Sequence, residues 1–189
     1  MMTRRQSLAI GLGTAFGLVA ECAEAQQISG RGRTLVAFFT RTGNTKLIAG
    51  VVRRHIGADL FEIQPAEPYP EDYEATVAQG EREKQTGYEP PLKENVGEIG
   101  AYSTIYLGFP IWGSTAPTVI KSFLSKHDLA GKELVPLITH GGYGAGDSPA
   151  VLRRMAPNAR LRKPFIIRMD QERAILREVT GWLQASGVR

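Results

Sequence analysis

The sequence contains almost no cysteine: Cys22 is the only one among 189 residues. A chain with a single cysteine has no internal disulfide. Cys22 also lies within the first 25 residues, which we interpret below as a leader that is removed. The mature chain would then have neither a thiol nucleophile nor a thiolate metal site, and we predict no metal site in it. Any redox chemistry of the mature protein must therefore come from a bound cofactor.

Other patterns that mark common function classes are also missing. No G-x-x-x-x-G-K-[ST] motif occurs, and no G-x-G-x-x-G motif follows the first predicted strand. Their absence argues against a P-loop NTPase and against a dinucleotide-binding Rossmann domain. The net charge is only +4, from 23 Lys and Arg against 19 Asp and Glu. Without a block of basic residues, this mild excess does not indicate nucleic-acid binding.

The longest apolar run, residues 8–20, is too short to span a bilayer and too rich in glycine to form a strong core helix. Arg4 and Arg5 precede it, and residues 3–8 resemble a twin-arginine export signal. Residues 23–25, Ala-Glu-Ala, match an A-x-A cleavage site. Together these features predict a leader that directs export.

We expect the export signal peptide to occupy residues 1–25, a short N-terminal segment residues 26–33, and one domain residues 34–189. The mature protein would be periplasmic and would have no stable membrane span. Two alternatives to the twin-arginine route stay open. One is a general secretion signal that contains paired arginines, and the other is a lipoprotein signal at Cys22, which Glu21 disfavours because a small residue is wanted there.

The composition of the chain is that of one globular domain with many turns. Hydrophobic residues make up 42% and charged residues 22%, and there are 21 glycines and 11 prolines. These proportions differ from those of disordered or fibrous chains. The length of 189 residues suits one domain with some excess at an end.

Beyond residue 33 the sequence alternates between two apolar patterns. Short continuous apolar runs, rich in β-branched and aromatic residues, predict strands that are buried on both faces. The segments between them have the apolar spacing of helices. The alternation predicts an α/β fold, a three-layer α/β/α arrangement around a five-stranded parallel sheet, but it does not fix the strand order. The predicted strands are residues 34–39, 60–63, 104–109, 134–139 and 164–168, and the predicted helices are residues 44–56, 73–84, 118–125, 149–155 and 171–185.

The turn after the first predicted strand, Thr40 to Thr45, combines hydroxyl groups, Gly43 and backbone N–H groups at the start of a helix. In a doubly wound sheet, ligands bind at the carboxyl ends of the strands. Such donors can surround a terminal phosphate, and Gly43 lets the backbone approach it closely. The same residue types are also ordinary helix caps. This turn alone therefore favours neither a phosphate site nor a helix start without a ligand.

The turns after the third and fourth predicted strands also have unusual compositions. Pro110 to Gly113 place Trp112 in a loop, where an exposed indole would suit a planar ligand. Residues 139–146 contain four glycines around Tyr143, which leaves peptide N–H and C=O groups accessible. A loop of this kind can line the edge of a ring.

These three turns resemble those of the flavodoxin family, in particular short flavodoxin-like proteins. The sequence carries T-x-T-G-N-T over residues 40–45, G-F-P-I-W over residues 108–112 with an A-P pair nearby, and T-x-G-G-x-G-x-G over residues 139–146. Glu-Pro-Tyr-Pro over residues 67–70 also looks like these relatives.

The resemblance implies the strand order 2-1-3-4-5, with FMN at the switch point between strands one and three. The phosphate would lie on the first turn and the isoalloxazine between the other two. The implied cofactor-binding residues are Thr40, Arg41, Thr42, Gly43, Asn44, Thr45, Pro110, Ile111, Trp112, Gly113, His140, Gly141, Gly142 and Tyr143.

Two positions depart from the pattern of the family. Many relatives have a second bulky aromatic residue after the tryptophan and a serine after the fourth-strand threonine, where this chain has Gly113 and His140. His140 either hydrogen-bonds or protonates the flavin, or it is a solvated loop histidine. Tyr143 either contacts the ligand or folds back onto the core. We expect Asp147 to cap the helix that follows.

Three functions fit this sequence. The first is an FMN oxidoreductase that passes electrons to a small-molecule acceptor such as a quinone. The sequence does not identify a catalytic side chain for it. The second is an electron carrier that serves a redox protein partner. Family carriers tend to be strongly acidic, so the charge of +4 argues against their usual docking mode. The third is a relative that has lost the flavin and binds another ligand.

Overall fold

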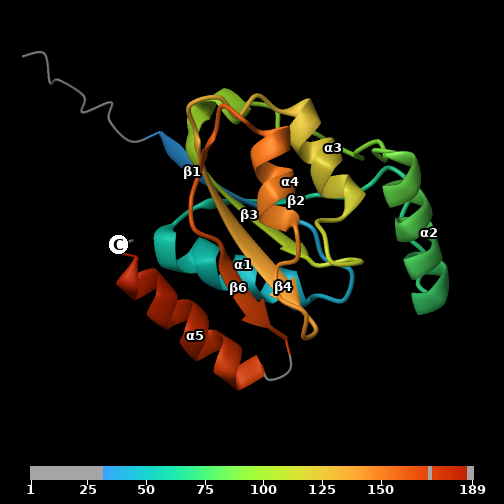
Figure 1. Cartoon of the computed structure of the whole chain (residues 1–189). Coiled ribbons are helices and arrows are strands. Elements are labelled where there is room, and N and C mark those ends of the chain that lie inside the picture. The colour runs from blue at the N-terminus through green and yellow to red at the C-terminus, as the bar shows by residue number, and fades with distance from the viewer. Residues whose placement is uncertain (1–31, 170–171, 187–189) are drawn as a thin grey trace, which may run out of the picture.

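The computed structural model describes residues 32–169 and 172–186, with side chains from residue 177 onward in the last of these stretches. The predicted leader, residues 1–25 with Cys22, lies outside the described residues, as do residues 26–31. Strands and helices alternate along the described chain (Figure 1). The elements are β1 (Arg33–Phe38), α1 (Asn44–Ile56), β2 (Asp59–Glu62), α2 (Tyr73–Thr86), the short 3₁₀ helix η1 (Ile99–Ala101), β3 (Tyr102–Pro110), α3 (Thr118–Lys126), β4 (Glu133–His140), α4 (Ser148–Met155), β5 (Arg160–Leu161), β6 (Phe165–Arg168) and α5 (Glu172–Ala185).

The strands form one sheet in the order β2-β1-β3-β4-β5, and their pairings are parallel. β6 also pairs with β4, over residues 137–140, whereas β5 pairs with residues 133–134. The implied order 2-1-3-4-5 is confirmed, and two short strands share its fifth position. The predicted fifth strand, residues 164–168, corresponds to β6, which begins one residue later because Pro164 has no N–H to donate to the ladder. The sequence did not predict the two-residue strand β5.

The predicted helices are confirmed with small changes at their ends. α1 has the predicted bounds, because Gly43 and Gly57 on either side of it adopt left-handed conformations that end the helical geometry. α2 and α3 extend slightly beyond their predicted ends, to Thr86 and Lys126. Within the two described stretches, none of the helices combines the length and apolar character that a bilayer span requires.

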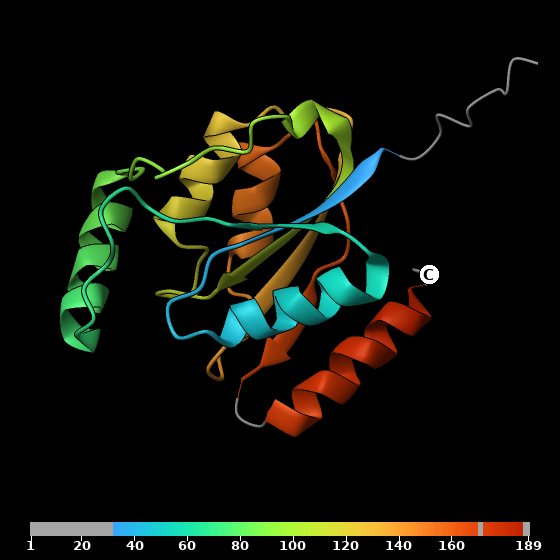
Figure 2. The same ribbon diagram turned by 180° about the vertical axis from the view of Figure 1, so that it is seen from behind.

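Successive side chains of β1 enter two separate apolar layers. Leu35 and Ala37 belong to one buried cluster, and Val36 and Phe38 belong to the other, because successive strand residues point to opposite faces. Helices α3 and α4 cover the first face, and α1 and α5 cover the second (Figures 1 and 2). Burial contributes about 1.5–3 kcal/mol for each large apolar side chain. The two layers therefore hold the carboxyl ends of the strands in fixed positions.

Helix α2 stands beside the sheet rather than over one of its faces (Figures 1 and 2). Its buried residues are Thr76 and Glu83, both polar. Asp72 caps its N-terminus, since the carboxylate accepts a hydrogen bond from the N–H of Ala75 at 2.7 Å. Polar contacts, rather than an apolar face, hold this helix at the edge of the molecule.

Candidate cofactor site

Three turns meet around one pocket of about 360 Å³ at the carboxyl ends of the strands. They are the β1–α1 turn (residues 39–43), the β3–α3 turn (residues 111–117) and the β4–α4 turn (residues 141–147). Three predicted site residues, Gly43, Gly142 and Tyr143, do not line the pocket. The other predicted site residues do line it: Thr40, Arg41, Thr42, Asn44, Thr45, Pro110, Ile111, Trp112, Gly113, His140 and Gly141.

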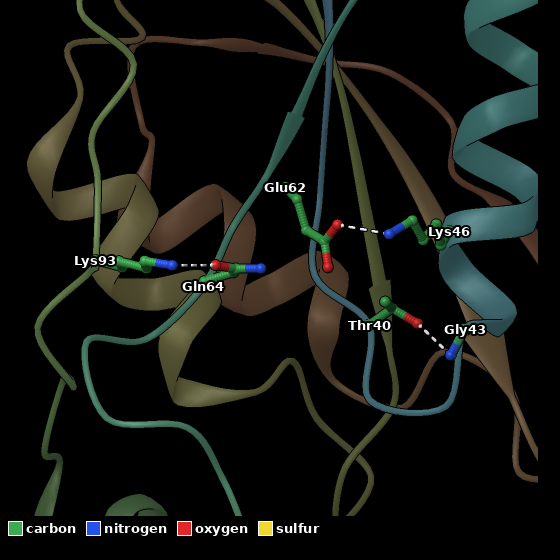
Figure 3. A network of polar contacts seen from close by, with 6 residues as sticks. All are labelled: Thr40, Gly43, Lys46, Glu62, Gln64 and Lys93. Atoms are coloured by element: carbon green, nitrogen blue, oxygen red, sulfur yellow. Dashed lines mark hydrogen bonds and ion pairs between the residues drawn. The ribbon is translucent and has the colours of Figure 1, made fainter.

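The β1–α1 turn leaves the N-terminus of α1 without a side-chain cap. Gly43 occupies the N-cap position in a left-handed conformation, with φ of 88°, and the first turn of the helix contains no acidic residue. Thr40 Oγ1 accepts a hydrogen bond from the N–H of Gly43 at 3.1 Å, which closes the turn (Figure 3). Thr42 and Asn44 are exposed beside it. A helix N-terminus of this kind, rich in donors and free of carboxylates, suits an anion.

Two other residues of this motif have partners within the protein. Thr45 is buried, and its Oγ1 lies 3.0 Å from Oγ1 of Thr139 at the end of β4. Arg41 donates to the carbonyl of Glu71 at 2.8 Å, and its guanidinium lies 5.6 Å from the ring centre of Tyr73. Thr45 therefore joins α1 to the sheet, and Arg41 joins the β1–α1 turn to the start of α2.

Trp112 lines the pocket, but it is only partly exposed. Its ring centre lies 4.8 Å from that of Tyr69 and 5.4 Å from that of Phe39, and both pairs are close to perpendicular. A Cβ atom placed on Gly80 of α2 would come within 3.3 Å of the indole. The expectation of a freely exposed indole is wrong, because these neighbours pack against it. Trp112 forms a rigid aromatic wall instead.

Glu83 of α2 is a buried carboxylate beside this aromatic cluster, with 5% of its surface exposed. It accepts hydrogen bonds from the hydroxyl of Tyr69 at 2.8 Å, from Nε2 of Gln79 at 2.9 Å and from the hydroxyl of Thr118. Burial raises the pKa of Tyr69 above its ordinary value, and the neighbouring Glu83 carboxylate acts in the same direction. Tyr69 therefore stays protonated and donates. The network links α2 to α3 next to the pocket.

The β4–α4 turn folds back onto the ring of His140. Nδ1 of His140 accepts hydrogen bonds from the backbone N–H groups of Gly142 and Gly144, at 3.0 and 3.2 Å. Tyr143 lies between these glycines and is 93% exposed. The alternative in which Tyr143 folds onto the core is wrong, because the two bonds hold its backbone out at the tip of the turn. Its contact with a ligand stays a prediction.

The β4–α4 turn also docks on the β3–α3 turn through backbone contacts. The N–H of Asp147 donates to the carbonyl of Ser114 at 3.0 Å. A Cβ atom placed on Gly146 would lie 1.9 Å from the same carbonyl oxygen, so only glycine fits there.

The prediction that the Asp147 side chain caps α4 is wrong. Asp147 occupies the N-cap position, but its ψ of 4° departs from the extended geometry typical of capping side chains, and no side-chain cap forms.

A second cavity, of about 530 Å³, adjoins the first, and residues 40–42 line both. Several of its polar side chains are already paired (Figure 3): Lys93 donates to Oε1 of Gln64 at 3.4 Å, and Glu62 forms an ion pair with Lys46 at 3.0 Å. We place the candidate site in the first cavity, because the three turns meet there.

Sequence reasoning missed the pocket wall that α2 provides. Tyr73, Val77, Gly80 and Lys84 of this wall recur at intervals of three or four residues, which is the spacing of one helix face. The rule that ligands bind at the carboxyl ends of strands could have found two more, Thr139 near the end of β4 and Met169 directly after β6. The lining residues not predicted are Tyr73, Thr76, Val77, Gly80, Glu81, Lys84, Thr115, Ala116, Pro117, Thr118, Lys121, Thr139 and Met169.

Solved structures of similar proteins share this architecture. A candidate flavoprotein from Bacteroides eggerthii has 31% identity and a TM-score of 0.71, over 84% of this chain and 100% of its own. Another from Bacteroides uniformis has 29% identity and a TM-score of 0.70, over 79% of this chain and 99% of its own. A flavoprotein from Lactobacillus acidophilus, solved in complex with FMN, has 21% identity and a TM-score of 0.63, over 76% and 97%. The likeness to this third protein concerns the fold alone.

Among curated proteins, none matches this chain. The family model for flavodoxin matches residues 33–185, a range that includes the whole sheet and all three turns. The similarity to the Bacteroides eggerthii protein, which covers the full length of that protein, agrees with this match. The chain belongs to the flavodoxin family.

Proposed function

We propose that this protein binds FMN in the pocket of about 360 Å³ and transfers electrons through it as an oxidoreductase. FMN is the cofactor of the flavodoxin family. When bound, it supplies one- and two-electron chemistry that protein side chains lack. One observation carries the proposal: the uncapped N-terminus of α1 lies at the same pocket as Trp112 and the glycine-rich β4–α4 turn.

The N-terminus of α1 fits the phosphate of FMN. The first-turn N–H groups and the side chains of Thr42 and Asn44 are donors, and the helix dipole adds about 0.3–1 kcal/mol of attraction. Thr42 and Asn44 are exposed and line the pocket, so their donors are accessible from it. Thr40 accepts from Gly43, which leaves its own O–H able to donate.

The other two turns fit a planar ring. Trp112 provides an aromatic wall that Tyr69 holds in place from the side. Gly141 is exposed and lines the pocket, so its peptide groups are accessible to a ligand. Arg41, Lys84 and Lys121 also line the pocket. Their positive charges favour an anionic ligand such as FMN.

The side chains of this pocket bind and orient; they do not have to supply a nucleophile. Lys84 donates to the carbonyl of Gly113 at 3.1 Å and so ties α2 to the β3–α3 turn. We expect this wall to shield one side of the bound ring from water. We infer that a small acceptor, such as a quinone, reaches the ring from the open side.

Absorbance of the protein purified under native conditions tests FMN binding, since a flavin absorbs visible blue light. Titration of the FMN-free protein then gives the affinity, and turnover of a quinone with a reduced nicotinamide tests the oxidoreductase role. A colourless protein that does not respond to added FMN would contradict the proposal.

A second candidate function is that of an electron carrier for a redox protein. Tyr143, which is 93% exposed at the tip of the β4–α4 turn, favours it, because exposed aromatic residues are typical of protein interfaces. Flavin reduction that requires a protein partner, together with no quinone turnover, would identify this function.

We also propose that the protein is exported to the periplasm through its leader, residues 1–25. The paired arginines and the Ala-Glu-Ala site support this proposal. Cell fractionation and N-terminal sequencing of the mature protein test it. Replacement of Arg4 and Arg5 by lysine should block export by the twin-arginine route and spare a general secretion signal.

A further inference from the structure

His127, which follows α3, and His140, the last residue of β4, differ in which ring nitrogen carries hydrogen. His127 is buried at the end of α3, with Nδ1 2.7 Å from the carbonyl oxygen of Phe123. Because a carbonyl only accepts, Nδ1 of His127 carries the hydrogen. Its Nε2 accepts from the N–H of Val96 at 3.0 Å. Both nitrogens of His127 are therefore used inside the protein.

In His140 the arrangement is reversed. Its Nδ1 accepts from the N–H groups of Gly142 and Gly144, so it carries no hydrogen, and the neutral ring has its hydrogen on Nε2. Nε2 has no hydrogen-bond partner within the described residues, and His140 is one of the residues that line the pocket. His140 thus brings a free donor to the pocket, in a tautomer that the backbone selects.

The ring is held in this arrangement from both ends of the turn. Rotation of the imidazole would break two hydrogen bonds, to Gly142 and Gly144. The far end of the turn is fixed on Ser114, where Asp147 donates and Gly146 packs against the carbonyl. The position of Nε2 is therefore set by the backbone before a ligand binds.

We propose that His140 has one task for each ring nitrogen: Nδ1 fixes the β4–α4 turn, and Nε2–H donates a hydrogen bond to the ring system of bound FMN. This inference rests on the proposed function, because it needs FMN in the pocket. A donor stabilises the ring more when the ring is reduced and holds more negative charge. His140 should therefore raise the reduction potential of bound FMN.

Two substitutions separate the tasks in the full chain. His140→Asn places an acceptor oxygen where Nδ1 lies and removes the donor at the position of Nε2. His140→Gln keeps an N–H donor near the position of Nε2 and loses the acceptor at the position of Nδ1. We expect His140→Asn to preserve the amide signals of Gly142 and Gly144 and to weaken the affinity for reduced FMN relative to oxidised FMN. A roughly tenfold change would lower the two-electron midpoint potential by about 30 mV.

The other variant should show the opposite pattern. His140→Gln should shift both glycine amide signals and weaken FMN binding in both redox states, with a smaller change in potential. His55→Asn and His55→Gln are matched controls, since His55 is exposed in the last turn of α1, and they should alter none of these readouts. Thermal unfolding of each variant shows whether it folds.

The ¹⁵N signals of the His140 ring in the FMN-free wild-type protein give a separate test. Hydrogen on Nε2 is expected, and hydrogen on Nδ1 would overturn the proposal. An unchanged midpoint potential in a folded His140→Asn variant that binds FMN would overturn the donor task. A wild-type chain that does not bind FMN would overturn the proposed function and the contact with FMN, while the ring signals would still decide whether His140 holds the turn.

Discussion

Helices α1 and α2 both begin beside the pocket, but their N-termini are built differently. α2 begins with Asp72, whose carboxylate accepts from Ala75, and it has Glu74 in its first turn. α1 begins with Gly43, and it has neither a side-chain cap nor an acidic residue in its first turn. The polar groups of α2 are thus satisfied by its own chain, whereas the donors of α1 are left for a ligand.

The two helix N-termini should therefore affect two different quantities, the free energy of unfolding and the affinity for FMN. A helix cap formed by a side chain contributes about 1 kcal/mol to the folded state whether or not a ligand is present. Open donors contribute when an anion arrives. Changes at the α1 terminus should therefore act on FMN affinity, and changes around α2 and α3 should act on the free energy of unfolding.

The largest effect is expected from Thr42→Ala combined with Asn44→Ala. The double variant removes two donors to a charged phosphate, each worth about 1.5–3 kcal/mol, so FMN affinity should fall by roughly a hundredfold or more. Both residues are exposed, and the free energy of unfolding without FMN should change by less than about 0.5 kcal/mol. Fluorescence titration with FMN and urea unfolding measure the two quantities.

Thr86→Ala with Asn95→Ala provides a matched control, because both residues are exposed and neither lines the pocket. The control should bind FMN like the wild type. Equal FMN affinity in the test variant and the wild type would refute the phosphate site at α1.

Glu83→Ala should have the next largest effect, on stability. It leaves the hydroxyls of Tyr69 and Thr118 without their buried acceptor, and each unsatisfied group costs about 1–3 kcal/mol. We expect the free energy of unfolding to fall by about 3 kcal/mol. Glu81→Ala is the control on the same helix, since Glu81 is exposed, and it should change the value by less than about 0.5 kcal/mol. Similar losses in both variants would contradict the network.

Asp72→Ala should have a smaller effect, again on stability. It removes the cap of α2 and should lower the free energy of unfolding by about 1 kcal/mol. Asp72→Asn, which keeps a capping oxygen, should recover most of that loss. FMN affinity should stay within twofold of the wild type in both variants. A large loss of affinity would contradict the view that the N-terminus of α2 acts on stability and not on FMN binding.

The sequence predicts most of what local signals determine. The ends of α1 follow from Gly43 and Gly57, and the three turns follow from the rule that ligands bind where parallel strands end. The strand order needed the resemblance to a family, because alternation of strands and helices is compatible with several orders. The strand β5 could not be predicted, because two residues are too few to show an apolar pattern.

The parts that could not be predicted depend on contacts between distant residues. The partial burial of Trp112 depends on Tyr69, which precedes it by 43 residues, and on Gly80 of α2. Glu83 is buried although acidic residues are mostly exposed, because Tyr69 and Thr118 donate to it. The buried residues of α2, Thr76 and Glu83, are polar and give no apolar stripe, so the sequence does not show which face of this helix packs against the domain.

The smallest effect is a pH dependence of stability at His127. Burial lowers the pKa of His127, and its two nitrogens are used as one donor and one acceptor. The folded state therefore favours the neutral ring. Below the ordinary pKa of about 6.5 the unfolded chain binds the proton more readily than the folded chain does, so stability falls as the pH decreases.

His127→Gln should remove this part of the pH dependence, while His55→Gln should retain it, because His55 is exposed. The measurement is the free energy of unfolding from about pH 7.5 down to about pH 5, where only groups with shifted pKa values give a slope. The difference between the wild-type and His127→Gln slopes should appear below about pH 6.5 and vanish above it. A wild-type slope of the opposite sign relative to His127→Gln would mean that the folded protein favours the charged ring of His127. That result would contradict the prediction.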